Sequence, residues 1–140
     1  MKYISRNIRQ TQDLGRGLAK KLRGGEILCL YGELGSGKTT FARGMINYFL
    51  PAKRVLSPTF IIVRHYYPEN NKINHIIHSD LYRLNKGREI EDLGLSEFFH
   101  RSGCVVLIEW PDRMKGLLPS KRTDIRFIQT DNRNRTIKIT

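Results

Sequence analysis

One segment of the chain reads Gly32-Glu33-Leu34-Gly35-Ser36-Gly37-Lys38-Thr39 and matches the phosphate-loop pattern G-x-x-x-x-G-K-[ST]. Residues 27–31, just before it, form a compact apolar run of strand length. Residues 38–50, after it, carry apolar side chains on two adjacent helical stripes, which predicts a largely buried helix ending at Pro51. A strand, a glycine-rich turn and a helix in this order predict a nucleoside triphosphate site.

Each residue type in this segment has a role in holding phosphate. The glycines let the backbone turn and approach a phosphate closely, and the amides of residues 35–39 are expected to point at the β-phosphate. Lys38 would reach the β- and γ-oxygens, and the Thr39 hydroxyl would ligate Mg²⁺, so we expect ATP and Mg²⁺ as cofactors. The predicted cofactor-binding residues of this segment are Gly32, Gly35, Ser36, Gly37, Lys38, Thr39 and Thr40.

A second acidic strand supports the same site. Residues 105–108 are apolar and are followed by Glu109 and Trp110, the pattern of a Walker B strand that places an acid beside the metal. Glu109 could ligate Mg²⁺, directly or through water, or orient the attacking water. The alternative, a strand-end glutamate facing solvent, is less favoured because a phosphate loop lies upstream.

The remaining pattern predicts one α/β domain spanning residues 1–140. Leu14, Leu18 and Leu22 indicate an amphipathic helix over 11–22, with Asn7 or Thr11 as the N-cap. The other predicted elements are a hairpin of strands 60–63 and 73–78, one or two short helices over 88–99 broken near Gly94, and a terminal hairpin of 123–129 and 136–140. Strands mixed with helices, several of them hairpin-linked, predict a three-layer P-loop NTPase-like fold with a mixed central sheet.

Composition sets limits on partners and compartment. Lysine and arginine number 25 against 13 acidic residues, giving a net charge of +12. This charge favours polyanionic partners such as nucleic acid, nucleotide or an acidic protein surface, and the alternative is a basic bias of the whole proteome that carries no functional information. The basic residues are spread along the chain, so charge alone does not establish an RNA contact. No apolar run is long enough for a membrane span or a signal peptide, so we expect a cytoplasmic protein. Cys29 and Cys104 lie in apolar runs and are interpreted as buried thiols, with a disulfide or reactive thiols as alternatives.

Four motifs occur in one order along the chain. The phosphate loop extended to Thr40 is followed by Ser57-Pro58-Thr59-Phe60, then by residues 78–84 (HSDLYRL), then by Ile108-Glu109-Trp110-Pro111. Together they closely resemble the bacterial TsaE (YjeE) family over about residues 11–119. The phosphate loop is generic, whereas the three later motifs in combination are specific.

The resemblance implies a small ATPase required for the N6-threonylcarbamoyl modification of adenosine 37 in tRNAs that read ANN codons. It names a partner, the TsaB–TsaD heterodimer, in which TsaD carries the threonylcarbamoyl transfer. No arginine finger is identifiable, with Arg43 and Arg83 as candidates only, so we expect slow hydrolysis alone and faster hydrolysis in the complex.

The resemblance also implies roles for single residues. Thr59 would offer its hydroxyl to nucleotide or metal; otherwise it belongs to an ordinary Ser-Pro turn. Asp80 would orient water or join the outer shell of the metal, and on its own would be a cap or turn residue. Trp110 would sense nucleotide or simply pack on the sheet, and Thr11 and Arg133 would approach the base or ribose. The predicted catalytic residues are Asp80, Glu109 and Lys38, and the predicted metal ligands are Thr39 and Glu109.

Three further side chains of the motif at residues 78–84 are not counted among the predicted site residues. His78 is interpreted as a packed strand-end histidine rather than a ligand. Tyr82 and Arg83 would hold the partner or the nucleotide, with surface packing equally plausible.

Two other functions fit the phosphate loop. A small-molecule kinase is one, although 140 residues leave little room for a substrate insert and an arginine-bearing lid. A nucleotide-gated tRNA-binding module with little hydrolysis is the other, and the net charge of +12 keeps it open.

Overall fold

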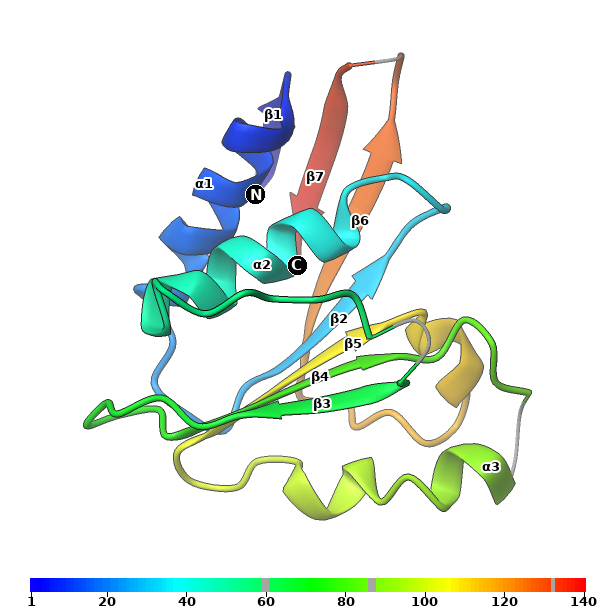
Figure 1. Cartoon of the computed structure of the whole chain (residues 1–140). Helices are drawn as coiled ribbons and strands as arrows, with labels where there is room; N and C mark the ends of the chain where they lie inside the picture. The colour runs from blue at the N-terminus through cyan, green and yellow to red at the C-terminus, as the bar shows by residue number, and fades with distance from the viewer. Residues whose placement is uncertain (59–60, 86–87, 132) are drawn as a thin grey trace.

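The computed structural model describes residues 1–58, 61–85, 88–131 and 133–140. Its elements run from a short N-terminal strand to a C-terminal hairpin (Figure 1). In chain order they are β1 (Lys2–Ser5), α1 (Ile8–Ala19), β2 (Ile27–Tyr31), α2 (Lys38–Phe49), β3 (Val63–Tyr66), β4 (His75–Asp80), α3 (Arg88–Glu91), the 3₁₀ helix η1 (Leu95–Phe98), β5 (Cys104–Glu109), the 3₁₀ helix η2 (Pro111–Met114), β6 (Thr123–Gln129) and β7 (Arg135–Ile139). No helix within these ranges is both long and apolar enough to cross a bilayer.

The strands of the described residues form one mixed sheet of seven in the order β1-β7-β6-β2-β5-β4-β3. Strands β6, β2, β5 and β4 are parallel neighbours, and β3, β7 and β1 add antiparallel edges. In the parallel part, Glu109 of β5 lies opposite both Leu30 of β2 and Asp80 of β4. The carboxyl ends of β2, β5 and β4 therefore lie side by side at one end of the sheet.

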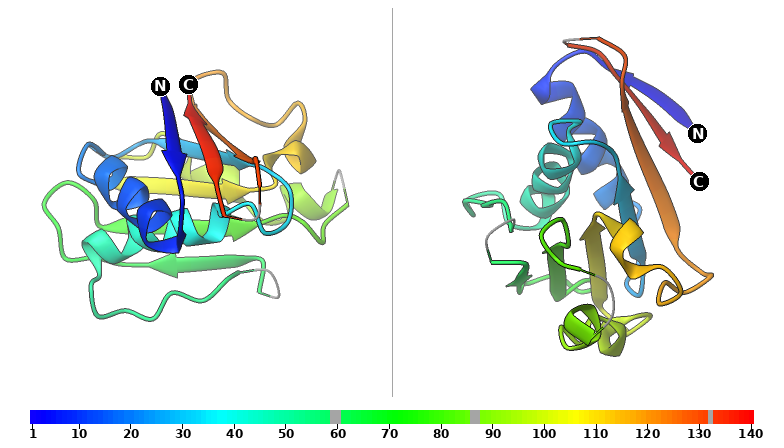
Figure 2. Two further views of the ribbon diagram at one scale, coloured as in Figure 1. Left: turned by 90° about the horizontal axis from the view of Figure 1, so that it is seen from above. Right: turned by 90° about the vertical axis from the view of Figure 1, so that its right-hand side faces the viewer.

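Helices cover both faces of this sheet, so the molecule has three layers (Figure 2). Helices α1 and α2 lie on one face, and α3, η1 and η2 lie on the other. Each face buries its own apolar cluster, with side chains such as Phe41 and Leu107 on the first and Ile77 and Ile108 on the second. Removing these side chains from water is the main stabilising contribution to such a fold. The predicted three-layer α/β domain is confirmed.

Helices α1 and α2 approach each other closely through two glycines. A Cβ added at Gly44 would collide with the carbonyl of Gln12, and one added at Gly15 would collide with the carbonyl of Phe41. Because the helices cross so closely, the N-terminal turn of α1 lies beside the N-terminal end of α2, next to the glycine-rich loop.

The local predictions agree with the structure apart from element boundaries. Helix α1 starts earlier than predicted, and Asn7 is its N-cap because its side-chain oxygen accepts a hydrogen bond from the Gln10 amide at 2.8 Å. Thr11, the other candidate cap, lies inside the helix. Both hairpins form, but the first strand of the first hairpin lies at 63–66 rather than 60–63, and residue 60 lies outside the described residues. The helical segment breaks at Gly94, which has a φ of 68°. Strand β1 is not anticipated by any pattern in the sequence.

Candidate functional site

The sheet topology assembles a pocket at the carboxyl ends of β2, β4 and β5. The glycine-rich loop (residues 32–39) follows β2, while Asp80 and Glu109 are the last residues of the two neighbouring strands. The pocket holds about 220 Å³. Its lining includes Lys38, Thr39, Asp80, Glu109, Trp110 and Arg135. Carboxyl ends of parallel strands are where α/β proteins commonly bind ligands.

Gly37 fixes the conformation of the loop where it enters α2. Its φ of 106° lies in the left-handed region, and a Cβ there would lie 3.1 Å from the Cδ of Arg135. A residue with a side chain would be strained and crowded at this position. Because the first amides of a helix have no intrahelical partner, the turn beginning at Lys38 presents N–H groups to the pocket.

Lys38 lies across the loop and is nearly buried. Its Nζ donates hydrogen bonds to the carbonyls of Gly32 at 2.6 Å and Glu33 at 2.9 Å. The same ammonium lies 4.9 Å from the centre of the Trp110 ring, within the range of a cation–π contact. Burial lowers the pKa of Lys38, and the carboxylates of Glu109 and Asp80 act in the opposite direction. The Lys38 ammonium is therefore bonded to the loop and shares its pocket with the carboxylates of Asp80 and Glu109.

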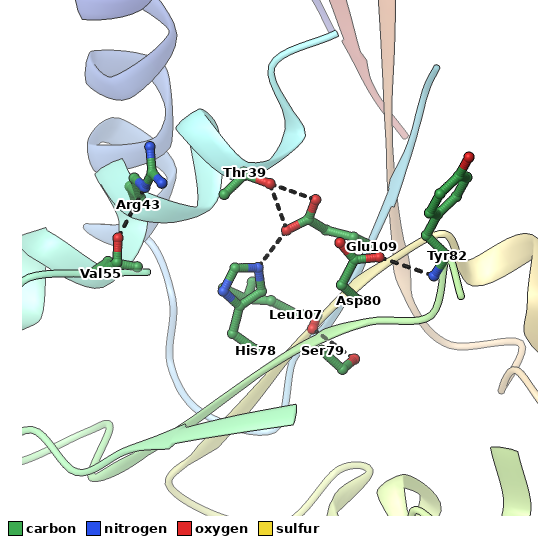
Figure 3. Close-up of polar contacts among 9 residues, drawn as sticks. All are labelled: Thr39, Arg43, Val55, His78, Ser79, Asp80, Tyr82, Leu107 and Glu109. Atoms are coloured by element: carbon green, nitrogen blue, oxygen red, sulfur yellow. Dashed lines mark hydrogen bonds and ion pairs between the residues drawn. The ribbon is translucent and has the colours of Figure 1, made fainter. Parts of the chain in front are cut away.

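A buried polar chain links α2, β5 and β4 (Figure 3). The Thr39 hydroxyl donates to Glu109, at 2.8 Å from Oε1 and 3.1 Å from Oε2. Nε2 of His78 lies 2.6 Å from Oε2 of the same carboxylate. His78 is 0% exposed and Glu109 is 2% exposed, so these contacts lie in the protein interior. Charges buried at this depth require such partners.

Asp80 forms the second acidic group of the pocket. Its Oδ1 accepts a hydrogen bond from the Tyr82 amide at 3.0 Å, which ties the carboxylate to the turn after β4. The Tyr82 ring lies 5.0 Å from the Trp110 ring, and Trp110 itself has a φ of 60°. The two carboxylates end adjacent strands and line the same pocket as Lys38.

The donor set suits a hard divalent cation. The Thr39 hydroxyl and the Glu109 carboxylate are oxygen donors in direct contact, which is the kind of ligand that Mg²⁺ prefers. Within the described part of the chain, no group of three or more His, Cys, Asp or Glu side chains could hold a metal on its own. Mg²⁺ in triphosphate sites takes only one or two protein oxygens beside phosphate and water, so the residues fit that ion.

The two residues predicted to approach the base or ribose lie in different surroundings. The Thr11 methyl lies 3.6 Å from where a Cβ on Gly37 would stand, and its hydroxyl lies 2.6 Å from that of Ser5. Arg133 is exposed in the turn between β6 and β7, where its amide bonds Asp131. Thr59 lies outside the described residues.

Arg135 reaches the loop and was not predicted. Its Nη2 donates to the carbonyl of Gly35 at 3.1 Å, and its side chain packs over Gly37. The alternation of side chains along a strand could have placed Arg135 on this side of the sheet, because it shares a face with Ile137, which is buried against α1 and α2. The predicted strand started one residue later, at position 136, and so left this arginine out.

Comparison with known proteins identifies the family. The family model described as threonylcarbamoyl adenosine biosynthesis protein TsaE matches residues 5–137. A Bacillus subtilis protein named tRNA threonylcarbamoyladenosine biosynthesis protein TsaE is 35% identical over 140 residues, covering 100% of this chain and 85% of that protein. Proteins of the same name from Rickettsia conorii and Streptomyces coelicolor are 37% and 40% identical, over 93% and 83% of this chain and 72% and 77% of their own lengths.

A solved structure agrees with these sequence matches. The crystal structure of Bacillus subtilis YdiB superposes with a TM-score of 0.80 at 30% sequence identity, covering 99% of this chain and 83% of that one. The family match, the curated relatives and the shared fold point to the same assignment: the chain belongs to the TsaE family.

Proposed function

We propose that this chain binds ATP with Mg²⁺ at the glycine-rich loop and hydrolyses it, acting in the cytoplasm on a TsaB–TsaD heterodimer during threonylcarbamoyladenosine biosynthesis in tRNA. The relatives carry this biosynthesis in their names. The observation that carries the proposal is the contact between the Thr39 hydroxyl and the Glu109 carboxylate, 2.8 Å apart, in the pocket that Lys38 also lines. A hydroxyl, a carboxylate and an ammonium there lie within reach of one triphosphate.

Binding would exchange the present contacts of Lys38 for phosphate. The ammonium now bonds two carbonyl oxygens of the loop, and phosphate oxygens are stronger acceptors because they are charged. The amides at the start of α2 would donate hydrogen bonds to the same anion. When bound, Mg²⁺ would neutralise developing charge on the transferring phosphoryl group, and Thr39 and Glu109 are the residues that would hold it.

The two carboxylates would divide the remaining work. Glu109 already bonds Thr39 and His78 with its two oxygens, which suits it to the metal side of the site. Asp80 lies beside it on β4 and is the better candidate for accepting a hydrogen bond from the attacking water. Replacing Asp80 by Asn should therefore lower turnover more than it lowers the affinity for ATP.

Hydrolysis with and without the partner tests the proposal. Phosphate release should be slow for the isolated chain and faster with TsaB–TsaD, because a missing transition-state cation costs about 10³-fold or more. Thr39→Ala should remove Mg²⁺-dependent turnover, and cells carrying only this variant should lack the modified adenosine in digests of their tRNA. Wild-type levels of modification with Thr39→Ala would contradict the assignment.

The charge of the chain favours one other function. A net charge of +12 fits a nucleotide-gated tRNA-binding module with little hydrolysis. A titration with tRNA at increasing salt separates the two: steeply salt-dependent binding by the isolated chain, with no ATP turnover in the complex, would favour the binding module.

A further inference from the structure

His78 stands out because it is a fully buried titratable group that the proposed chemistry does not use. It is 0% exposed in β4, and its Nε2 lies 2.6 Å from Glu109 Oε2. Nε2 donates to this carboxylate in the tautomer that carries the hydrogen on Nε2, and a carboxylate without a proton can only accept. The other ring nitrogen, Nδ1, is buried and has no hydrogen-bond partner among the described residues.

The register of β4 and β5 explains why the two side chains meet. His78 lies opposite Leu107, and Asp80 lies opposite Glu109. Residues two apart share a face of a strand, so His78 and Glu109 are diagonal neighbours on the face covered by α1 and α2 (Figure 3). The histidine therefore approaches the carboxylate from the side away from the loop, while Thr39 approaches it from α2.

We propose that His78 is a positioning residue that holds Oε2 of Glu109, so that Oε1 faces Thr39 and the metal side of the pocket. This rests on the function proposed above. The carboxylate is held from two directions, by a donor on β4 and by a donor on α2. Donors that fix a metal-ligating group in this way commonly change metal affinity 10–100-fold when they are removed.

A role in packing alone would not require a histidine here. An apolar residue of similar size would fill the space without leaving a ring nitrogen such as Nδ1 unpaired. It would, however, leave Glu109 Oε2 without its shortest contact, in a place where the carboxylate is 2% exposed. The histidine thus serves the orientation of Glu109 more than the packing of the core.

The test measures Mg²⁺ rather than turnover. ATP binding is followed by calorimetry with the chelator EDTA and then with increasing Mg²⁺, for the wild type, His78→Leu and His78→Gln. His78→Leu should bind ATP in EDTA like the wild type and need about tenfold more Mg²⁺ to reach the tighter state. His78→Gln, whose side-chain amide can reach the carboxylate, should restore most of the Mg²⁺ affinity.

Ser79→Ala is the matched control. Ser79 is equally buried on the same strand, but its hydroxyl donates to the Leu107 carbonyl and not to Glu109. The Mg²⁺ requirement of the Ser79→Ala variant should therefore match that of the wild type. A folded His78→Leu variant with a wild-type Mg²⁺ requirement would overturn the inference alone. If His78→Leu does not fold, His78→Asn replaces it, because its shorter amide cannot reach Oε2; equal Mg²⁺ affinity for the Asn and Gln variants overturns the inference. A wild-type chain that binds no ATP with Mg²⁺ would remove both this inference and the proposed function.

Discussion

Towards their carboxyl ends, strands β4 and β5 bury different side chains on their two faces, although both faces contribute to an apolar cluster. The face towards α1 and α2 ends in His78, Asp80 and Glu109, all nearly inaccessible to water. The face towards α3 carries Ile77 and Ile108 at the same depth and packs into an apolar cluster. The two sets alternate along the same two strands.

The difference shows how a buried strand pair can serve two purposes. Polar groups are tolerated on the first face because each carboxylate has a donor nearby, as Glu109 has in Thr39 and His78. The second face fixes the spacing of the strands by close packing. Substitutions of the three polar residues on the first face should therefore change the chemistry more than the stability, and substitutions of Ile77 and Ile108 on the second face should do the reverse.

Glu109→Gln tests the polar face and should have the largest effect. The amide keeps the size of the side chain but removes its charge, so we expect ATP hydrolysis to fall about 10³-fold, or about 4 kcal/mol in the barrier. The melting temperature should change less than the turnover, because the amide oxygen can still accept a hydrogen bond from one of the two donors, Thr39 or His78. Steady-state phosphate release and thermal unfolding followed by circular dichroism measure the two quantities. Loss of folding together with loss of turnover would break the comparison.

Ile77→Ala tests the apolar face. Ile77 is completely buried beside His78, and its truncation should lower the free energy of unfolding by about 3 kcal/mol through lost burial and a residual cavity. The affinity of the folded protein for ATP with Mg²⁺ should be unchanged. Urea denaturation and calorimetry provide the measurements.

Ile128→Ala is the control for that truncation. Ile128 lies on β6 with 46% of its surface exposed, so the same chemical change should cost little stability. If Ile77→Ala weakened nucleotide binding as much as it weakened the fold, the two faces would not be separable.

Sequence alone could predict the polar face only where a local motif encodes it. Lys38 and Thr39 belong to one continuous pattern, and Glu109 ends a strand whose apolar run is visible in the sequence. The contact of His78 with Glu109 could not be predicted, since it depends on the pairing and register of two strands far apart in the chain. The sequence predicts a packed histidine at position 78, and the structure adds the hydrogen bond between His78 and the Glu109 carboxylate.

The sheet edges show a second limit of prediction. Strand β1 has only four residues and no clear alternation, and its pairing with β7 accounts for its presence. Arg135 was left out because a shift of one residue in a strand changes which face a side chain occupies. Boundaries of elements and contacts across the sheet are thus set by tertiary pairing, whereas the order of the elements follows from local pattern.

The smallest expected effect is the pH dependence of stability that comes from two buried thiols, and it tests how well the apolar face excludes water. Cys29 and Cys104 are free, buried and part of the apolar cluster on the α3 face. Burial raises the pKa of Cys29 from 9.0 to about 12 and also raises the pKa of Cys104. The native thiols therefore stay protonated above pH 9, where those of the unfolded chain ionise, so unfolding releases protons and stability falls as pH rises.

The free energy of unfolding should fall by at most about 1.4 kcal/mol per pH unit for each thiol between pH 9 and the native pKa, and this dependence should fade within about one pH unit below pH 9. Urea denaturation of the wild type and of Cys29→Ala at pH 8 and pH 10 isolates it, because the tyrosines and lysines that also titrate there are common to both proteins. The wild type should lose more stability between the two pH values than the variant does. Two results would contradict this: an equal loss of stability in both proteins, or rapid labelling of the native thiols by a disulfide reagent at pH 8. Either would mean that water reaches this face of the sheet and that the two faces differ less than their packing indicates.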